Sequence, residues 1–454
     1  MDPRVIQLEP PSPPSLKTRR RNRALLPLVA CASLAWSLPS HAQVSVTTFP
    51  SGFSGYDQQL GVTVLSRLRP EYEPPGIQLG GFVIRPEVDQ SIFDNSNVNG
   101  TANGAGSWGS QTAASVSAQS NWSRNSLAAT VGVDHYQYFQ LPTDNYTDWN
   151  VGIQGGYTIG ESQLTAAYSH QSFHELGNQI GTVQSSTPVL DQTDTAQLYY
   201  TFNFGRVAVT PTISFSSYQY GPASVQGGTL NQDFLNRNVV AGGATARYSL
   251  NDQSGLLLVA RGVQSNYTQP LAGQPSNNST SFLLMTGIDY QAAGVWRYSL
   301  LAGVEVRSFA ASEFATRTAP IVSASAIWTP TGVLTVSGVL SRSIEDPESG
   351  GTNGFILSQG HLVVDYELTR SILLQGRGGF QYAEYLGAGD QTNYTFGAGV
   401  TWLLNRKLRL ALDDDYTKQS GLGSLNQVLT PIEGSFQSGQ YSQNLLALTL
   451  RVAF

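Results

Sequence analysis

The stretch WRYSLLAGVEVR at residues 296–307 alternates apolar and polar side chains over most of its length. Its apolar set is Trp296, Tyr298, Leu300, Ala302, Val304 and Val306, and its polar set is Arg297, Ser299, Glu305 and Arg307. Successive side chains of a β-strand point to opposite faces of the sheet. The stretch therefore predicts a strand with one lipid-compatible face and one wet face.

The same alternation recurs along most of the chain, for example at 82–92, 195–204 and 394–404. About 18 such segments follow one another, joined alternately by tight turns and by longer polar loops. We therefore predict an all-β fold. It is a single transmembrane antiparallel up-and-down β-barrel over residues 81–454, with about 18 strands or, as the alternative, about 16. A large soluble sandwich or propeller is the competing architecture.

Aromatic side chains fall near the ends of these segments. Membrane barrels carry two girdles of such rings, one at each boundary between lipid and water. If the tight turns face the periplasm, the predicted rings lie at two levels. The set is Trp149, Tyr157, Phe204, Phe282, Tyr290, Trp296, Trp328, Tyr394 and Trp402.

The N-terminal region resembles an export signal. Lys17, Arg19, Arg20, Arg21 and Arg23 precede a mostly apolar run, and Ser40-His41-Ala42 offers small residues for cleavage. We predict a signal peptide at 1–42 that is cleaved after Ala42. A membrane anchor that is never cut, or a lipoprotein cleavage box ending at Cys31, are the alternatives.

Residues 43–80 form a predicted periplasmic N-terminal extension. Pro70, Pro74 and Pro75 favour a stiff segment outside the sheet. It could be a tether, a docking site, a plug that enters the barrel, or a disordered leader.

Composition excludes several classes of function. Cys31 is the only cysteine and lies in the segment expected to be removed, so we expect no disulfide scaffold, zinc finger or cysteine nucleophile. The chain has 31 acidic and 25 basic residues, which argues against nucleic acid as a partner. No constellation of catalytic, metal-binding or cofactor-binding residues stands out, and we expect no enzyme and no cofactor.

Charged side chains of both signs occur at the inward positions of the predicted strands. The candidate lumen-lining set is Arg85, Glu87, Asp89, Asp289, Arg297, Glu305, Arg307, Arg409, Asp413 and Arg451. Rows of opposite charge facing each other across a pore would order water and orient solutes. The alternative is that these residues pair with one another and fill space.

The C-terminal residues form a regular apolar row. Leu448, Leu450, Val452 and Phe454 alternate with smaller or polar residues, and the chain stops on an aromatic. This pattern is typical of the terminal strand by which the barrel-assembly machinery recognises its clients. An ordinary terminal strand is the alternative.

The region around the first predicted strand also resembles a known family. Residues 67–77 (RLRPEYEPPGI), Leu79 to Phe82, Pro86 and Phe93-Asp94-Asn95 are similar to the opening of the family called putative beta-barrel porin type 2. Glu73 stands where the family usually has Asp, and one Asp of its Asp-Asp-Asn run is missing. Residues 402–416 resemble its penultimate hairpin. The resemblance implies a barrel in the outer membrane, and some members lie near exopolysaccharide genes.

The expected function is that of an outer-membrane, porin-like channel for passive or gated passage of hydrophilic solutes. The alternatives are an accessory or conduit in exopolysaccharide export, which would need periplasmic export partners, and a barrel-embedded hydrolase. The expected surroundings are outer-membrane lipid, lipopolysaccharide and the barrel-assembly machinery. The oligomeric state is left open.

Overall fold

A computed structural model describes residues 63–454, except 177–178, 183–184, 226–227, 272, 292–294, 347–353, 386–388 and 422–439. The expected signal peptide and its cleavage site lie outside the described residues, as do residues 43–62 of the expected extension. Within the described part, no helix is long and apolar enough to cross a membrane.

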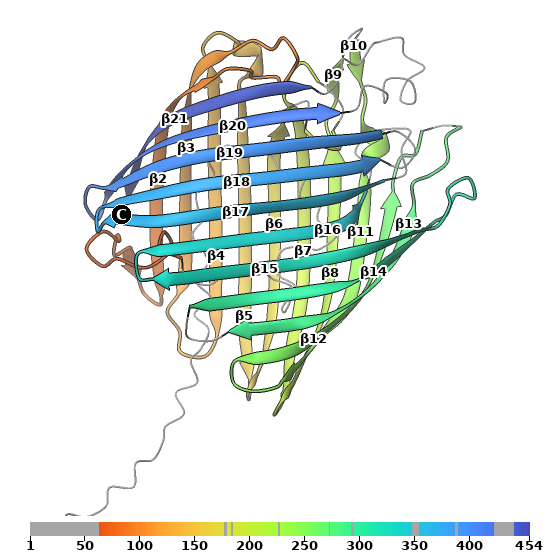
Figure 1. Cartoon of the computed structure of the whole chain (residues 1–454), viewed down its shortest axis with the longest axis horizontal. Coiled ribbons are helices and arrows are strands. Elements are labelled where there is room, and N and C mark those ends of the chain that lie inside the picture. The colour runs from red at the N-terminus through yellow and green to blue at the C-terminus, as the bar shows by residue number, and fades with distance from the viewer. Residues whose placement is uncertain are drawn as a thin grey trace, which may run out of the picture. The chain divides into compact units, whose positions relative to one another are not determined.

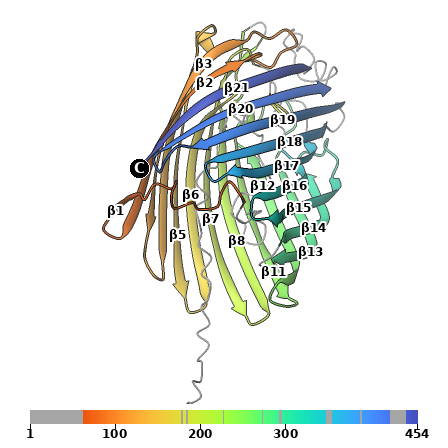
Figure 2. The same cartoon turned by 60° about the vertical axis from the view of Figure 1, so that its left-hand side comes forward.

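Eighteen long antiparallel strands form one closed ring (Figures 1 and 2). They are β2 (Phe82–Asn95), β3 (Ser107–Ser120), β4 (Ser126–Tyr138), β5 (Tyr146–Ile159), β6 (Ser162–Glu175), β7 (Val189–Phe204), β8 (Val207–Tyr220), β11 (Arg237–Ser249), β12 (Ser254–Tyr267), β13 (Ser279–Gln291), β14 (Trp296–Phe309), β15 (Arg317–Thr331), β16 (Leu334–Glu345), β17 (Phe355–Thr369), β18 (Ile372–Tyr385), β19 (Gly389–Leu403), β20 (Leu408–Gly421) and β21 (Tyr441–Ala453). Each pairs with its neighbours in sequence, and β2 pairs with β21 to close the ring. The predicted barrel and strand number are confirmed.

Several short elements accompany the ring. They are β1 (Ile77–Leu79), which pairs with β2, the hairpin of β9 (Ala223–Val225) and β10 (Gly228–Leu230), and the 3-10 turns η1 (Pro142–Asp144) and η2 (Asp233–Leu235). The expectation that residues up to 80 lie outside the sheet is therefore wrong for β1. Gly80, with φ of 57°, provides the tight turn that folds β1 back onto β2.

The connections differ between the two ends of the barrel. At one end, called here the short-turn end, strands are joined by tight turns, such as those at Gly160 and Gly205, whose φ values are 62° and 63°. Such left-handed positions suit glycine because it has no Cβ. The other end carries most of the longer connections and is called the long-loop end. This alternation is the one predicted from the sequence.

The outward face of the strands is apolar. All nine predicted girdle rings point outward with the exposed positions of their strands. Some of them pack across neighbouring strands: the rings of Trp296 and Trp328 stack with centroids 5.6 Å apart. An exposed apolar surface around a closed ring is what a lipid environment would cover.

Leu300 tests this lipid face. It is exposed on the outward side of β14, between Trp296 at the start of the strand and Val306 near the long-loop end. Arg at mid-depth on the lipid face of a membrane barrel costs about 2–4 kcal/mol. We expect Leu300→Arg to lower the free energy of unfolding in lipid vesicles by that amount. Leu300→Ile is the matched control, and equal urea midpoints for the two variants would contradict a lipid-facing strand.

The wall is strongly bent where β12 to β15 follow one another. Inward apolar side chains bury one another there: Leu257, Val259, Leu283, Met285, Leu301 and Ile321. Glycines stand between them at inward positions where neighbouring backbones come close. In Figure 1, β17–β20 run nearly horizontally, whereas β4–β8 of the opposite wall run nearly vertically. The interior is therefore not a uniform cylinder, and part of its wall is a packed apolar core.

Candidate functional site in the barrel interior

All ten predicted lumen-lining residues lie on the inward side of their strands, at alternate positions with the exposed apolar row. Their surroundings differ. Arg85 and Arg297 are near the short-turn ends of β2 and β14 and are exposed. Most of the others form ion pairs, described below, with side chains on nearby strands or on the N-terminal segment. The pairing alternative, rather than rows that face each other across the barrel, accounts for these residues.

The seam between the first and last strands carries one such pair. Asp89 and Arg451 lie directly opposite each other on β2 and β21. Arg451 Nε donates to Asp89 Oδ1 over 2.7 Å, and Glu87 Oε2 lies 3.5 Å from Arg451 Nη1. A bidentate guanidinium–carboxylate pair fixes geometry as well as charge. It therefore helps to set the register in which the ring closes.

Two further pairs reach over an intervening strand at a glycine. Arg377 on β18 extends across β19 to Asp413 and Asp415 on β20, with N–O distances of 3.0 and 2.9 Å. A Cβ on Gly399 would lie 2.2 Å from Asp413 Oδ1, and one on Gly397 would lie 2.0 Å from Asp415 Oδ1. Because the inward glycines of β19 have no side chains, Arg377 and the two aspartates can meet above this strand.

The pair of Arg247 and Asp289 is built in the same way. Arg247 on β11 reaches over β12 to Asp289 on β13, with an Nε–Oδ2 distance of 2.7 Å. Gly255 of β12 lies beneath it, where an added Cβ would be 2.7 Å from Asp289 Oδ1 and 2.9 Å from Arg247 Cζ. The same arrangement therefore occurs twice in this wall: an Arg and an Asp two strands apart form an ion pair across an inward glycine of the strand between them.

Gly399→Ala tests that device. The new methyl group would force Asp413 away from Arg377 and leave a buried carboxylate poorly paired, at an expected cost of about 1–3 kcal/mol in the free energy of unfolding. Gly376→Ala on β18 is the matched control, because its Cβ would meet nothing within 4 Å. Chemical denaturation in detergent or lipid measures both, and equal stability would show that the glycine is not needed for the pair.

Glu305 and Arg307 belong to a buried cluster toward the long-loop end. Their exposed fractions are 0% and 2%. Arg307 Nη1 donates to Asp346 over 2.8 Å, Nη2 lies 3.3 Å from Glu305, and Arg237 Nε lies 3.4 Å from Asp346. The expectation that Glu305 and Arg307 are wet is wrong, because residues from β11, β16 and the chain just beyond β16 cover them. Their charges are satisfied within the protein rather than by water.

The connection between β6 and β7 contacts the opposite wall. Ile180 in this connection is 2% exposed and packs against Phe355 and Leu357 of β17 and Ala383 and Tyr385 of β18. The Gly181 N–H donates to the Tyr385 hydroxyl over 2.6 Å. In strand order β17 and β18 lie halfway around the ring from β6 and β7. The connection therefore crosses the interior at the long-loop end.

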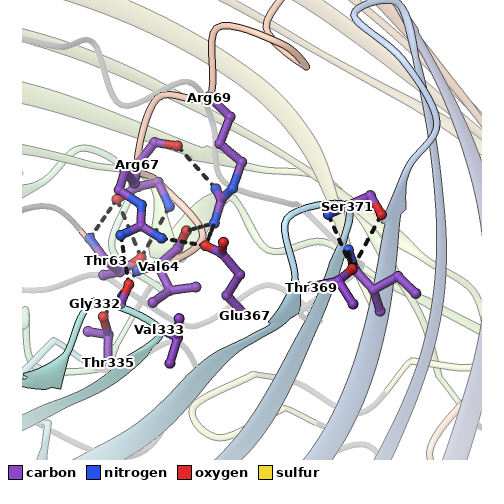
Figure 3. A network of polar contacts seen from close by, with 12 residues as sticks. Thr63, Val64, Arg67, Arg69, Gly332, Val333, Thr335, Glu367, Thr369 and Ser371 are labelled. Atoms are coloured by element: carbon purple, nitrogen blue, oxygen red, sulfur yellow. Dashed lines mark hydrogen bonds and ion pairs between the residues drawn. The ribbon is translucent and has the colours of Figure 1, made fainter.

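The N-terminal segment, residues 63–73, lies against the inward side of the wall at the short-turn end (Figure 3). Arg67 and Arg69 both pair with Glu367 of β17, and the Arg67 Nη1 donates to the Gly332 carbonyl over 2.7 Å. Val64 packs against the inward Leu373 and Leu403. Sequence reasoning named a plug as one of several options for this region but did not identify these contacts.

An acidic row crosses the first strands of the ring. Asp89 is opposite Ala113, Ala113 is opposite Asp134, and Asp134 is opposite Asp148. Gln111 Nε2 donates to both oxygens of Asp134 over 2.9 Å, and Asp148 accepts from His174 Nδ1 over 2.7 Å. No Arg or Lys pairs with Asp134 or Asp148 among the ion pairs of the described residues. The wall here is net negative.

Several charged residues of the interior were not identified from the sequence: Asp134, Asp148, Arg237, Arg247, Asp346, Arg377 and Asp415. For those in the long strands, counting every second residue from the exposed apolar row would have found them. Asp346 follows β16 and no alternation marks it. Among the described residues, no group of three or more His, Cys, Asp or Glu side chains could hold a metal ion.

The terminal strand places its predicted assembly residues on the outside. Leu448, Leu450 and Phe454 are exposed on the outward face, and Val452 shares that face. The Phe454 N–H donates to the Pro86 carbonyl over 3.1 Å, and Lys407 Nζ lies 5.0 Å from the centre of the Phe454 ring. The last residue is therefore bound at the seam.

Comparisons with solved structures find other barrels. The FrpB iron transporter from Neisseria meningitidis matches with 10% identity and a TM-score of 0.42, over 82% of this chain and 82% of its own. The outer membrane protein opdK from Pseudomonas aeruginosa matches with 12% identity and a TM-score of 0.42, over 82% and 99%. A BenF-like porin from Pseudomonas fluorescens Pf-5 matches with 10% identity and a TM-score of 0.45, over 83% and 100%.

Among curated proteins, no significant match is found. The family model described as "Putative beta-barrel porin 2" matches residues 69–427, which is most of the chain and includes most of the barrel strands. This chain therefore belongs to that porin family.

Proposed function

We propose that the barrel is an outer-membrane channel through which hydrophilic solutes pass, with its short-turn end in the periplasm. The observation that carries the proposal is a closed ring of 18 strands with a largely polar inward face and an apolar outward face. Membrane barrels of 16 to 18 strands are too wide for side chains to fill and leave an aqueous path. Membership of a porin family supports the same conclusion.

The contents of the interior support a narrowed rather than a wide path. The β6–β7 connection crosses the long-loop end at Ile180, and the N-terminal segment lines the short-turn end. Between them lie the acidic row of Asp89, Asp134 and Asp148 and the pairs made by Arg377 and Arg451. A wall with surplus negative charge raises the local concentration of cations. We expect a modest preference for cations.

Reconstitution in planar bilayers tests the channel. Purified protein whose folding is shown by heat-modifiability on gels should give stepwise conductance, and a salt gradient should give a reversal potential of the sign expected for cation preference. Asp134→Asn with Asp148→Asn should lower that preference and keep the conductance steps. Folded protein without any steps would refute an open channel and favour the alternative of a scaffold in polysaccharide export.

We further propose that the terminal row guides assembly into the outer membrane. Phe454→Asp should reduce the amount of heat-modifiable barrel in the outer membrane, because a charge replaces the exposed aromatic at the seam. Leu404→Asp, at another exposed position near the same end, is the matched control. Equal loss for both variants would point to general destabilisation instead of a terminal recognition signal.

A further inference from the structure

Charged side chains of the N-terminal segment bind the barrel at three successive turns of the short-turn end. Gly332 is in the β15–β16 turn, Glu367 and Arg370 flank the β17–β18 turn, and Arg409 follows the β19–β20 turn. Arg67 binds the carbonyl of Gly332, and both Arg67 and Arg69 pair with Glu367. Glu73 pairs with Arg409, with 3.1 Å between Oε2 and Nη2. The segment therefore spans the inner rim from β16 to β20.

Glu367 is the centre of this attachment. Its Oε2 accepts from Arg69 Nη2 over 2.8 Å and also from Arg67, as Figure 3 shows. The pairing of β17 with β18 is irregular between Glu367 and Thr369, a type of distortion that re-aims side chains. Arg69 Nη2 also donates to the Val64 carbonyl over 2.8 Å. One carboxylate thus holds two guanidinium groups and, through Arg69, the turn that carries Val64.

Val64 provides the apolar part of the attachment. Its side chain, 2% exposed, packs against Leu373 and Leu403, which both point inward from the wall. Its N–H donates to the Thr335 hydroxyl over 3.1 Å, so the backbone is satisfied as well. The segment therefore lies inside the opening rather than beneath it.

Each of these contacts involves a side chain, and none of them is a ladder of backbone hydrogen bonds like those between the strands. The segment has no strand pairing of its own between Thr63 and Gly76, and β1 ties it to the sheet only at Ile77–Leu79. A segment attached by side-chain contacts, without strand pairing, opens at a smaller free energy than a strand of the ring. It can therefore leave the wall while the barrel stays folded.

We propose that residues 63–73 form an autoinhibitory strap, which narrows the short-turn opening when Glu367 holds Arg67 and Arg69 and widens it on release. The proposal rests on the channel function proposed above. Release leaves the strands intact, because each of these contacts is made by side chains or turns of the wall. The strap makes conductance depend on the state of the chain's own N-terminal segment.

Thiol reactivity measures the strap without relying on conductance. In a Cys31→Ala background, Val64→Cys should react slowly with a water-soluble maleimide because the position is buried. Adding Glu367→Gln weakens both guanidinium contacts and should raise the rate about tenfold, equivalent to about 1.4 kcal/mol. Adding Arg370→Gln should leave the rate unchanged, because its pair with Glu71 is exposed, and such pairs contribute little. Equal rates in all three would overturn the strap.

Conductance then tests whether the strap inhibits. Oxidation of a Val64→Cys, Leu403→Cys pair should lock the segment on the wall and lower single-channel conductance, and a reductant should restore it. Channels with Glu367→Gln should spend more time at the higher conductance level than channels with Arg370→Gln. If thiol rates change but conductance does not, the segment moves without inhibiting, and the proposal is wrong. If no variant conducts, the channel function fails, while the thiol rates still report the strap.

Discussion

Glu305→Arg is expected to lower the free energy of unfolding by about 3–5 kcal/mol, even though the residue lies on the polar face of its strand. Glu305 is fully buried beside Arg307, and the two side chains share the cluster that contains Asp346. The substitution removes one carboxylate and adds a cation where water cannot reach. A buried charge without a partner is among the costliest changes a single residue can make.

Two variants separate this effect from a change in net charge. Glu305→Gln keeps the shape and should cost less, because it adds no positive charge. Glu313→Arg carries the same change of charge in the exposed connection after β14 and should be neutral. Urea unfolding from lipid vesicles, followed by tryptophan fluorescence, measures all three. A neutral Glu305→Arg would mean that the cluster is open to water.

Gly303→Ala should have an effect of similar or larger size, about 4 kcal/mol or more, at the upper end for a single substitution. Gly303 is opposite Met285 in the bent part of the wall. A Cβ there would lie 1.9 Å from the Leu284 carbonyl oxygen and 2.7 Å from Met285 Cα. These are backbone atoms, so no side-chain rotation can relieve the contact. The strands must move apart, and the bend of the sheet is lost.

The yield of heat-modifiable barrel after refolding into vesicles is the measurement for Gly303→Ala. Gly287→Ala should behave alike, since its Cβ would lie 1.9 Å from the Leu300 carbonyl oxygen. Gly376→Ala, with nothing within 4 Å, should refold as well as the parent protein. If all three glycine variants refold equally, the close approach of β13 and β14 is not required for closure.

The face of each side chain could be predicted from the sequence, but its surroundings could not. Alternation assigns Val304 to the outside and Glu305 to the inside because successive side chains of a strand point opposite ways. Whether an inward residue is wet depends on what lies over it. Glu305 is fully buried beside Arg307, and Arg307 pairs with Asp346, about forty residues further along the chain. No local pattern records that contact.

The local curvature of the sheet could not be predicted from the sequence either. Gly303 and Gly152 are both inward glycines within strands, yet a Cβ on Gly303 would lie 1.9 Å from a backbone oxygen, whereas a Cβ on Gly152 would come no closer than 4.0 Å to the backbone of another strand. The difference arises from how sharply the ring bends at each position, which depends on all its strands together. The N-terminal segment shows the same limit: its proline-rich sequence indicated a stiff segment, while its binding to Glu367 depends on the distant β17–β18 turn.

The seam has a consequence for the order of events during biogenesis. Asp89 and Arg451 are 362 residues apart in sequence, so the part of β2 beyond its pairing with β1, Glu87–Asn95, has no second neighbour until the final strand has been made. Until then the growing sheet has two unpaired edges, which are templates for aggregation. A prematurely terminated chain would keep both edges permanently and should be cleared by periplasmic proteases. Both edges are therefore covered only in a chain that reaches β21, and the pair of Asp89 and Arg451 stabilises that closure.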